Sequence, residues 1–184
     1  CACLVGSEMC IRDRYLVVSD NHGDRDILVD LVDRYRSEVD IFFHCGDSEL
    51  EASDPLWDTF QVVQGNCDYG PGFEQKKVIQ TGQDTVFMTH GHLSNVRFGL
   101  TQLAIEARAA TADMVFFGHT HQIGCEMDQK ILFLNPGSIS QPRGPIQIPS
   151  YALIESLDDQ ISVQYYNRAH QAVEELAFSF SRER

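Results

Sequence analysis

The first half of the chain alternates short apolar runs with one amphipathic stretch, and this rhythm restricts the fold more than any other feature. Residues 14–20 (RYLVVSD), 40–47 (DIFFHCGD) and 60–66 (FQVVQGN) are rich in β-branched and aromatic residues, which predicts three buried strands. Residues 24–38 carry apolar side chains at helical spacing, with Asp24 as the expected N-cap. Strand, helix and strand in this order predict parallel pairing.

The second half predicts a second helix and more antiparallel strands. Residues 76–91 contain two strand-like runs about a glycine-containing turn, and residues 123–138 and 150–178 each predict a hairpin. Residues 95–113 have the apolar spacing of a helix. The apolar positions of this helix include Phe98, Leu103, Ile105 and Ala109. Together the two halves predict an α/β domain of two packed sheets with helices outside.

Residues 1–14 (CACLVGSEMCIRDR) have neither helical nor strand periodicity, and they contain three of the six cysteines. We expect a non-native or disordered leader here and a single domain over residues 15–184, since a chain of 184 residues suits one domain with its own core. The cysteines include no CxxC pair, so disulfides are not expected.

The charge of the chain limits its partners. The formal net charge is −13, and twelve Asp or Glu residues lie between positions 20 and 58, against three arginines. An acidic surface repels a phosphate backbone, so no extended nucleic-acid surface is expected. No apolar run has the length of a membrane span, and no basic stretch followed by an apolar one marks a secretory leader, which predicts a cytoplasmic protein without a membrane partner.

Polar side chains follow five of the predicted strands at the point where each strand ends. The clearest case is residues 113–121 (DMVFFGHTH), in which an apolar run ends in a glycine and two histidines. Each motif alone is weak, because Asp, Asn and Gly are common in turns. Their succession favours one shared site, since α/β sheets bind ligands beyond the carboxyl ends of their strands. The candidate ligands are Asp20, His22, Asp47, Asn66, His90, His119 and His121.

These residue types predict a metal centre. Carboxylate and amide oxygens with imidazole nitrogens suit Mn²⁺, Fe²⁺, Zn²⁺ or Ni²⁺. Seven candidate ligands exceed the four of a tetrahedral zinc site and suit two cations that share a bridging carboxylate. Such cations would also supply the positive charge that phosphate chemistry needs and that this acidic chain does not obviously provide.

The motifs as a set resemble the calcineurin-like metallophosphoesterase superfamily. The segments SDNHGD, GNCD, THGH, GHTH and NPGS are most similar to the small bacterial and archaeal phosphodiesterase branch, which includes the eukaryotic retromer subunit Vps29. The resemblance extends from Tyr15 to about Tyr166. It implies a four-layer α/β/β/α sandwich of two mixed sheets flanked by helices, in agreement with the pattern of strands and helices.

The resemblance also implies roles for individual residues. The ligands of one metal would be Asp20, His22 and His121. Asp47 would be the bridging carboxylate. The ligands of the second metal would be Asn66, His90 and His119. The implied cofactors are two divalent cations, with Mn²⁺ expected and Ni²⁺, Fe²⁺ or Zn²⁺ as alternatives.

One position departs from the wider family pattern. Many members have a histidine after the GN asparagine, where it helps to protonate the leaving group, and Cys67 stands there in this chain. A thiol is a poorer general acid than an imidazole near neutral pH. His92 is therefore our candidate for part of that role, and a histidine that supports a ligand or is merely exposed is the alternative. Asn66 is expected to help neutralise charge on the phosphoryl oxygens.

The resulting hypothesis is a metal-dependent phosphodiesterase acting on a small phosphoester substrate. The alternative is a catalytically idle scaffold of the same fold that binds other proteins, and a nuclease on long DNA is disfavoured by the acidic first half. A homo-oligomer is possible, since apolar positions in the last strands could pair. We expect three further residues to lie outside the chemistry: His44 in the core, His170 on the surface, and Arg143 on the surface with a possible part in binding.

Overall fold

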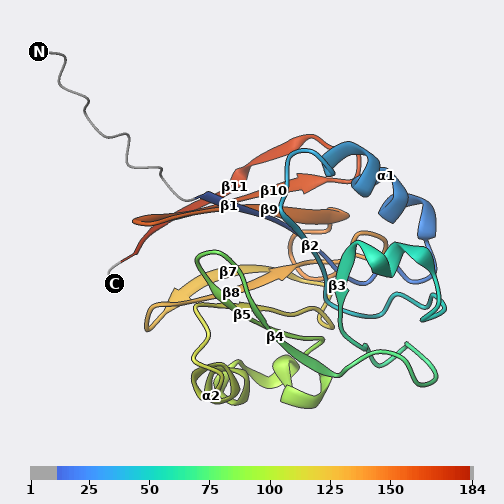
Figure 1. Cartoon of the computed structure of the whole chain (residues 1–184), viewed down its shortest axis with the longest axis horizontal. Helices are drawn as coiled ribbons and strands as arrows, with labels where there is room; N and C mark the ends of the chain where they lie inside the picture. Colours follow the sequence, from blue (N-terminus) through green and yellow to red (C-terminus); the bar gives the residue numbers. More distant parts are fainter. Residues whose placement is uncertain (1–11, 183–184) are drawn as a thin grey trace, which may run out of the picture.

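The computed structural model describes residues 12–182 and contains two β-sheets stacked face to face (Figure 1). The six-stranded sheet has the order β11 (Ala172–Ser181), β10 (Gln160–Asn167), β9 (Ser150–Leu157), β1 (Arg12–Val18), β2 (Ile41–His44) and β3 (Phe60–Val62). The five-stranded sheet has the order β4 (Lys76–Gln80), β5 (Thr85–Thr89), β6 (Met114–Phe116), β8 (Ile131–Pro136) and β7 (Ile123–Asp128). Both sheets mix parallel and antiparallel pairs.

Helices cover the outer face of each sheet. Figure 1 shows α1 (Arg25–Tyr35) above the six-stranded sheet and α2 (Thr101–Ala109) below the five-stranded sheet. Three short 3₁₀ helices, η1 (Pro55–Asp58), η2 (His92–Ser94) and η3 (Val96–Phe98), lie in connecting segments. The predicted four-layer α/β/β/α sandwich of two mixed sheets is confirmed. None of the helices within residues 12–182 has the length and apolar character needed to cross a membrane.

The central strands are apolar on both faces because each face meets a different layer. Tyr15 and Val17 of β1 point into the core between the sheets, whereas Leu16 and Val18 pack toward α1, and all four are fully buried. This explains the continuous apolar run in the sequence, which is typical of parallel strands covered on both sides. Asp24 caps α1 as predicted, since its side chain accepts a hydrogen bond from the backbone N–H of Ile27.

Two predicted boundaries are wrong. Strand β1 begins at Arg12, so Arg12–Arg14 belong to the six-stranded sheet rather than to the predicted leader, because they pair with β9 and Arg14 contacts Glu155 at 3.1 Å. The rest of that predicted leader, residues 1–11, lies outside the described residues. The helix predicted over residues 95–113 is shorter. It begins only at Thr101, because Asn95 and Gly99 before it have positive φ and interrupt the helical backbone.

Several side chains that the sequence assigned to one environment lie in another. Of the predicted apolar positions, Phe98, Ile105 and Ala109 are exposed, whereas Leu103 is buried as predicted, together with Ala107. His170 was expected on the surface, yet its side chain is only 11% exposed. The turn after β10 folds back onto α1, where His170 contacts the Tyr151 hydroxyl at 2.9 Å and Asp30 at 2.6 Å.

The strand directions bring the candidate ligands to one end of the sandwich. Strands β1, β2 and β3 run parallel, and so do β5, β6 and β8. Parallel strands end at the same edge of a sheet, so the loops after β1, β2 and β3 meet the loops after β5 and β6. The predicted polar positions lie in these five loops.

Candidate metal centre

Hydrogen bonds between backbones join two pairs among the five loops that follow β1, β2, β3, β5 and β6. The N–H of Asp20 donates to the carbonyl oxygen of Gly46 at 3.0 Å, which ties the first loop to the second. The N–H of Gly118 donates to the carbonyl oxygen of His90 at 3.0 Å, which ties the fifth loop to the fourth. Within each of these two pairs of loops, the side chains are therefore held relative to one another by the main chain.

Backbone strain is concentrated at the candidate ligands. Non-glycine residues rarely adopt positive φ, and such strain gathers at functional sites. Five of the seven candidate ligands have φ between 45° and 67°. These five are Asp20, His22, Asp47, His119 and His121. The fold thus maintains an unfavourable conformation at most of the positions that the sequence singled out.

The carboxylate of Asp68 organises the loop that carries Asp47. Its Oδ1 accepts from the N–H groups of Ser48 and Glu49, each at 2.8 Å, and from the hydroxyl of Ser48 at 2.9 Å. Its Oδ2 accepts from the N–H of Asp47 at 2.9 Å and the N–H of Gly65 at 2.7 Å. Successive backbone N–H groups form an anion-binding concavity, and here a buried side chain of the chain itself fills it.

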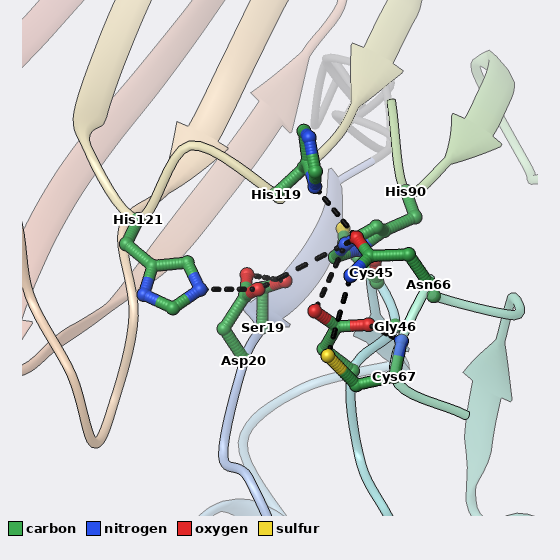
Figure 2. Close-up of polar contacts among 12 residues, drawn as sticks. Ser19, Asp20, Cys45, Gly46, Asn66, Cys67, His90, His119 and His121 are labelled. Carbon is green, nitrogen blue, oxygen red and sulfur yellow. Dashed lines mark hydrogen bonds and ion pairs between the residues drawn. The ribbon is translucent and has the colours of Figure 1, made fainter. Parts of the chain in front are cut away.

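One group of side chains converges around Asp20. Figure 2 shows His121 directed at Asp20, whose Oδ1 lies 3.1 Å from His121 Nε2. The Nε2 atoms of His22 and His121 are 3.2 Å apart. One ligand atom from each of Asp20, His22, Asp47 and His121 lies within 4.8 Å of the others. These are three residues assigned to the first predicted metal together with the predicted bridge.

A second group adjoins the first. Asn66 Oδ1 lies 3.1 Å from His90 Nε2 and 2.7 Å from His119 Nδ1 (Figure 2). Asp47 Oδ2 is 3.3 Å from His90 Nε2, so this carboxylate contacts both groups. The structure therefore brings together all seven predicted ligands, and it places Asp47 between the two sets.

Three imidazoles are oriented by hydrogen bonds on the side away from the centre. His90 Nδ1 lies 2.7 Å from the carbonyl oxygen of Cys45, and His121 Nδ1 lies 2.7 Å from that of Gln141. His22 Nδ1 lies 2.6 Å from a carboxylate oxygen of Glu49. Because these oxygens accept, Nδ1 of each ring carries a proton, which leaves Nε2 as the atom that the ring would offer to a metal in its neutral form. This is the arrangement that supports histidine ligands of metals.

The residues fit a cation because two buried polar atoms at this site have no hydrogen-bond partner. Within residues 12–182, Asp20 Oδ1 and His92 Nδ1 are the buried side-chain polar atoms that lack one. The other oxygen of Asp20 accepts from the hydroxyl of Ser19. Asp20 Oδ1 lies 3.1 Å from His121 Nε2, and a buried carboxylate oxygen without a hydrogen bond is stabilised by a nearby cation. The donor set of carboxylate, amide and imidazole suits divalent transition metals.

The electrostatics of the buried centre favour charged carboxylates. Burial opposes ionisation of Asp47, but the hydrogen bond and charge of His90 and the N–H of Cys67 outweigh it, so the pKa of Asp47 lies well below its usual range. Burial would likewise lower the pKa of His90, yet contact with Asp47 and the charge of Asp20 raise it. Asp47 is thus held in the form that binds cations.

At the rim of the centre, the surroundings favour the neutral forms of His119, His92 and Cys67. Burial, the charge of His90 and the charge of Arg97 lower the pKa of His119 to about 4, so the ring is neutral at pH 7. Burial and the nearby His90 also lower the pKa of His92, whose ring centroid lies 5.4 Å from that of His90. Burial and the negative charge of Asp47 raise the pKa of the Cys67 thiol to about 11.

His44 and Arg143 behave as the sequence indicated. His44 is fully buried, its Nε2 lies 2.8 Å from Asn21 Oδ1, and the N–H of Gly46 donates to its Nδ1 at 3.1 Å. Burial lowers the pKa of His44 to about 4, which keeps the ring neutral. Arg143 is exposed. Both residues therefore lie outside the two converging groups. His44 contacts the first loop through Asn21 and the second loop through Gly46.

Three residues that contribute to the centre received no role from the sequence. They are Asp68, which binds four backbone N–H groups, Glu49, which orients His22, and Arg97, whose Nε donates to His119 Nε2 at 3.0 Å. The only local signal was for Asp68, since it follows the GN asparagine within the same motif. Glu49 and Arg97 meet their partners across 27 and 22 residues of chain, so no local pattern reveals them.

Gly118 is required because its neighbours leave no room for a side chain. A Cβ atom at this position would overlap Ser19 Oγ and lie 2.6 Å from Asp20 Oδ2. We expect Gly118→Ala to destabilise the fold by about 1–3 kcal/mol through overpacking and to displace Asp20, which weakens Mn²⁺ binding.

Denaturation in urea and Mn²⁺ titration of Gly118→Ala test this expectation. The matched control is Gly124→Ala, where the new Cβ meets nothing closer than Asn135 Cβ at 3.8 Å. Equal stability and equal Mn²⁺ affinity of the two variants would show that Gly118 is not a packing constraint on the centre.

Comparison with known proteins agrees with the geometry. Residues 14–159 match the family model described as the calcineurin-like phosphoesterase superfamily domain. The probable metallophosphoesterase YsnB of Bacillus subtilis is 37% identical over 161 residues, which are 88% of this chain and 95% of that protein. The probable metallophosphoesterase MJ0623 of Methanocaldococcus jannaschii is 32% identical over 114 residues, which are 60% of this chain and 59% of that protein.

Solved structures share the fold over nearly the whole chain. A predicted phosphoesterase from Streptococcus pneumoniae superposes with a TM-score of 0.91 and 40% identity, covering 94% of this chain and 99% of that one. The zinc complex of Vps29 from Entamoeba histolytica superposes with a TM-score of 0.69 and 22% identity, covering 92% and 98%. The resemblance drawn from the motifs is confirmed, and the chain belongs to the calcineurin-like phosphoesterase superfamily.

Proposed function

We propose that this centre binds two divalent cations, with Mn²⁺ as the resident ion, and hydrolyses phosphodiester bonds of small substrates. The observation that carries the proposal is the buried Asp20 Oδ1, which has no donor and faces His121 Nε2 at 3.1 Å. Carboxylate oxygen and imidazole nitrogen are both ligands of divalent transition metals, and one ligand atom from each of Asp20, His22, Asp47 and His121 lies within 4.8 Å of the others. Family membership supports a phosphoesterase hydrolase.

The ligands divide into two sets that share one carboxylate. Asp20, His22 and His121 would hold one cation, and Asn66, His90 and His119 would hold the other. Asp47 would contact both, in keeping with its place between the two groups. When bound, the cations would lower the pKa of a water molecule toward neutrality and neutralise charge on the phosphoryl oxygens.

The residues around the ligands would position the substrate and hold protons. The lowered pKa of His92 keeps its ring neutral at pH 7, so the ring can donate a hydrogen bond to the leaving-group oxygen, whereas only its imidazolium form could deliver a proton. The raised pKa of Cys67 keeps the thiol protonated, which makes it a weak proton donor and not a nucleophile. The Asn66 amide donates to Cys67 Sγ at 3.2 Å, which orients both side chains toward the centre. Without a strong acid here, esters with good leaving groups should react best.

Turnover and metal dependence test the proposal together. Protein stripped with a chelator should hydrolyse neither bis(p-nitrophenyl) phosphate nor p-nitrophenyl phosphate, and added Mn²⁺ should restore hydrolysis, faster for the diester. Because Mn²⁺ binds the folded state, a concentration about a hundredfold above Kd should add about 2.7 kcal/mol and raise Tm by about 5–10 °C. These effects are measured by absorbance and by thermal unfolding.

The two alternatives give different results in these assays. Protein that takes up Mn²⁺ and gains Tm but hydrolyses neither ester would favour the catalytically idle scaffold. Protein that takes up no transition metal at all would contradict both the metal centre and the hydrolase proposal. The presence of all seven candidate ligands around one centre favours the enzyme.

A further inference from the structure

The five loops of the centre contain a single arginine and no lysine. These loops are residues 19–24, 45–50, 64–75, 90–100 and 118–122. The arginine is Arg97, which is exposed and lies in η3. A phosphate ester that approaches the centre meets the carboxylates of Asp20, Asp47 and Asp68 in a chain with a net charge of −13. Arg97 is the one permanent positive charge in these loops that can attract the ester and offset the carboxylates.

No carboxylate within residues 12–182 neutralises Arg97. Among residues 12–182, no acidic side chain lies within ion-pair distance of its guanidinium, whereas Arg14 pairs with Glu155 and Arg108 with Asp128. A guanidinium has five N–H donors. One of them, at Nε, donates to His119 Nε2 at 3.0 Å. The remaining donors have no hydrogen-bond partner in the described part of the chain, and they are available to an anion.

The position of Arg97 is fixed relative to the metal centre. The guanidinium directly contacts one candidate ligand, His119, whose Nδ1 lies 2.7 Å from Asn66 Oδ1 on the other side of the ring. On the other side the loop is anchored to the fold, because Val96 is buried and the hydroxyl of Ser94 donates to Glu106 of α2 at 2.8 Å. Arg97 therefore stands at the mouth of the centre on an anchored segment.

We propose that Arg97 binds a phosphoryl oxygen of the substrate, an inference that rests on the proposed phosphodiesterase function. Arginine matches the geometry of phosphate oxygens with parallel N–H donors, and hydrogen bonds between two charged groups are stronger than the bond to a neutral imidazole. The guanidinium can thus exchange its contact with His119 for a substrate oxygen. Arg97 supplies binding and orientation, and the leaving-group step belongs to other residues.

Binding of inorganic phosphate to the Mn²⁺-loaded protein tests this role directly. Arg97→Ala should weaken phosphate binding in isothermal titration by about 10- to 100-fold, as expected for the loss of charge-assisted hydrogen bonds. KM for bis(p-nitrophenyl) phosphate should rise, with a smaller change in kcat. Arg97→Lys should retain part of the affinity, since it keeps the charge but loses the paired donors. The Mn²⁺ content of each variant is measured in parallel.

The matched control is Arg108→Ala, which removes the same charge from α2, where Arg108 is 3.7 Å from Asp128. This variant should bind phosphate within about twofold of wild type, because salt screens distant charges. If Arg97→Ala binds phosphate as tightly as Arg108→Ala at equal Mn²⁺ content, the inference is wrong. Wild type that hydrolyses no diester would overturn the proposed function, while the phosphate affinities of the two variants would still decide the role of Arg97.

Discussion

Replacing Asp47 with asparagine should reduce kcat/KM for a phosphodiester by about 100-fold or more. Removing a group that merely supports a metal ligand costs about 10- to 100-fold, and Asp47 contacts both groups of candidate ligands directly. The substitution removes the negative charge while changing little else. Asp47 has a φ of 54°, and asparagine is among the residues that tolerate this conformation best. The amide oxygen can still accept the Cys67 N–H, now 2.7 Å from Asp47 Oδ1.

Metal analysis and kinetics on the same preparation measure this effect. Asp47→Asn should hold fewer Mn²⁺ ions per chain than wild type and should lose diester turnover, while circular dichroism stays unchanged. Asp33→Asn is the control for the loss of one charge, since Asp33 is 67% exposed on α1, and it should retain wild-type kinetics. Full Mn²⁺-dependent turnover by Asp47→Asn would show that this carboxylate is not a shared ligand.

Replacing Asp68 with alanine should cause the largest loss of stability. The carboxylate accepts hydrogen bonds from four backbone N–H groups and one hydroxyl, and it is buried. Each buried donor left without a partner costs about 1–3 kcal/mol. The variant should therefore unfold with a free energy about 4 kcal/mol or more below that of wild type. Because three of the four amides belong to the loop of Asp47, Mn²⁺ binding should weaken as well.

Urea denaturation in the presence of a chelator isolates this effect from metal binding. The matched control is Asp113→Ala, because Asp113 Oδ2 accepts from the N–H of Thr85 at 2.8 Å and that variant leaves one backbone donor unpaired. Asp113→Ala should lose about 1–3 kcal/mol. A loss for Asp68→Ala no greater than that of Asp113→Ala would mean that water replaces the carboxylate in the loop.

Much of the centre could be predicted from the sequence because its candidate ligands follow strands directly. Asp20, Asp47 and His119 each come within three residues of the end of β1, β2 and β6. A strand of alternating or continuous apolar residues is visible in the sequence, and parallel strands end at a common edge. The strand order along the chain was therefore enough to bring the ligand positions together.

The supporting residues could not be predicted in the same way. Glu49 and Arg97 act on histidines far away in the chain, and nothing near either residue indicates which side chain it will meet. The same limit explains the errors at Phe98 and His170. Helical spacing assigned Phe98 to a buried face, although the helix starts after it, and a polar turn assigned His170 to solvent, although the turn folds onto α1.

The sequence by itself determined the strands, the layers and the identity of the candidate ligands, because these depend on the periodicity of apolar residues and on what immediately follows each strand. Only the tertiary structure decided that Asp68 fills the loop of Asp47, that Glu49 orients His22 and that Arg97 donates to His119. Those contacts join loops that are distant in sequence, and the packing of the two sheets against each other sets the distances between them.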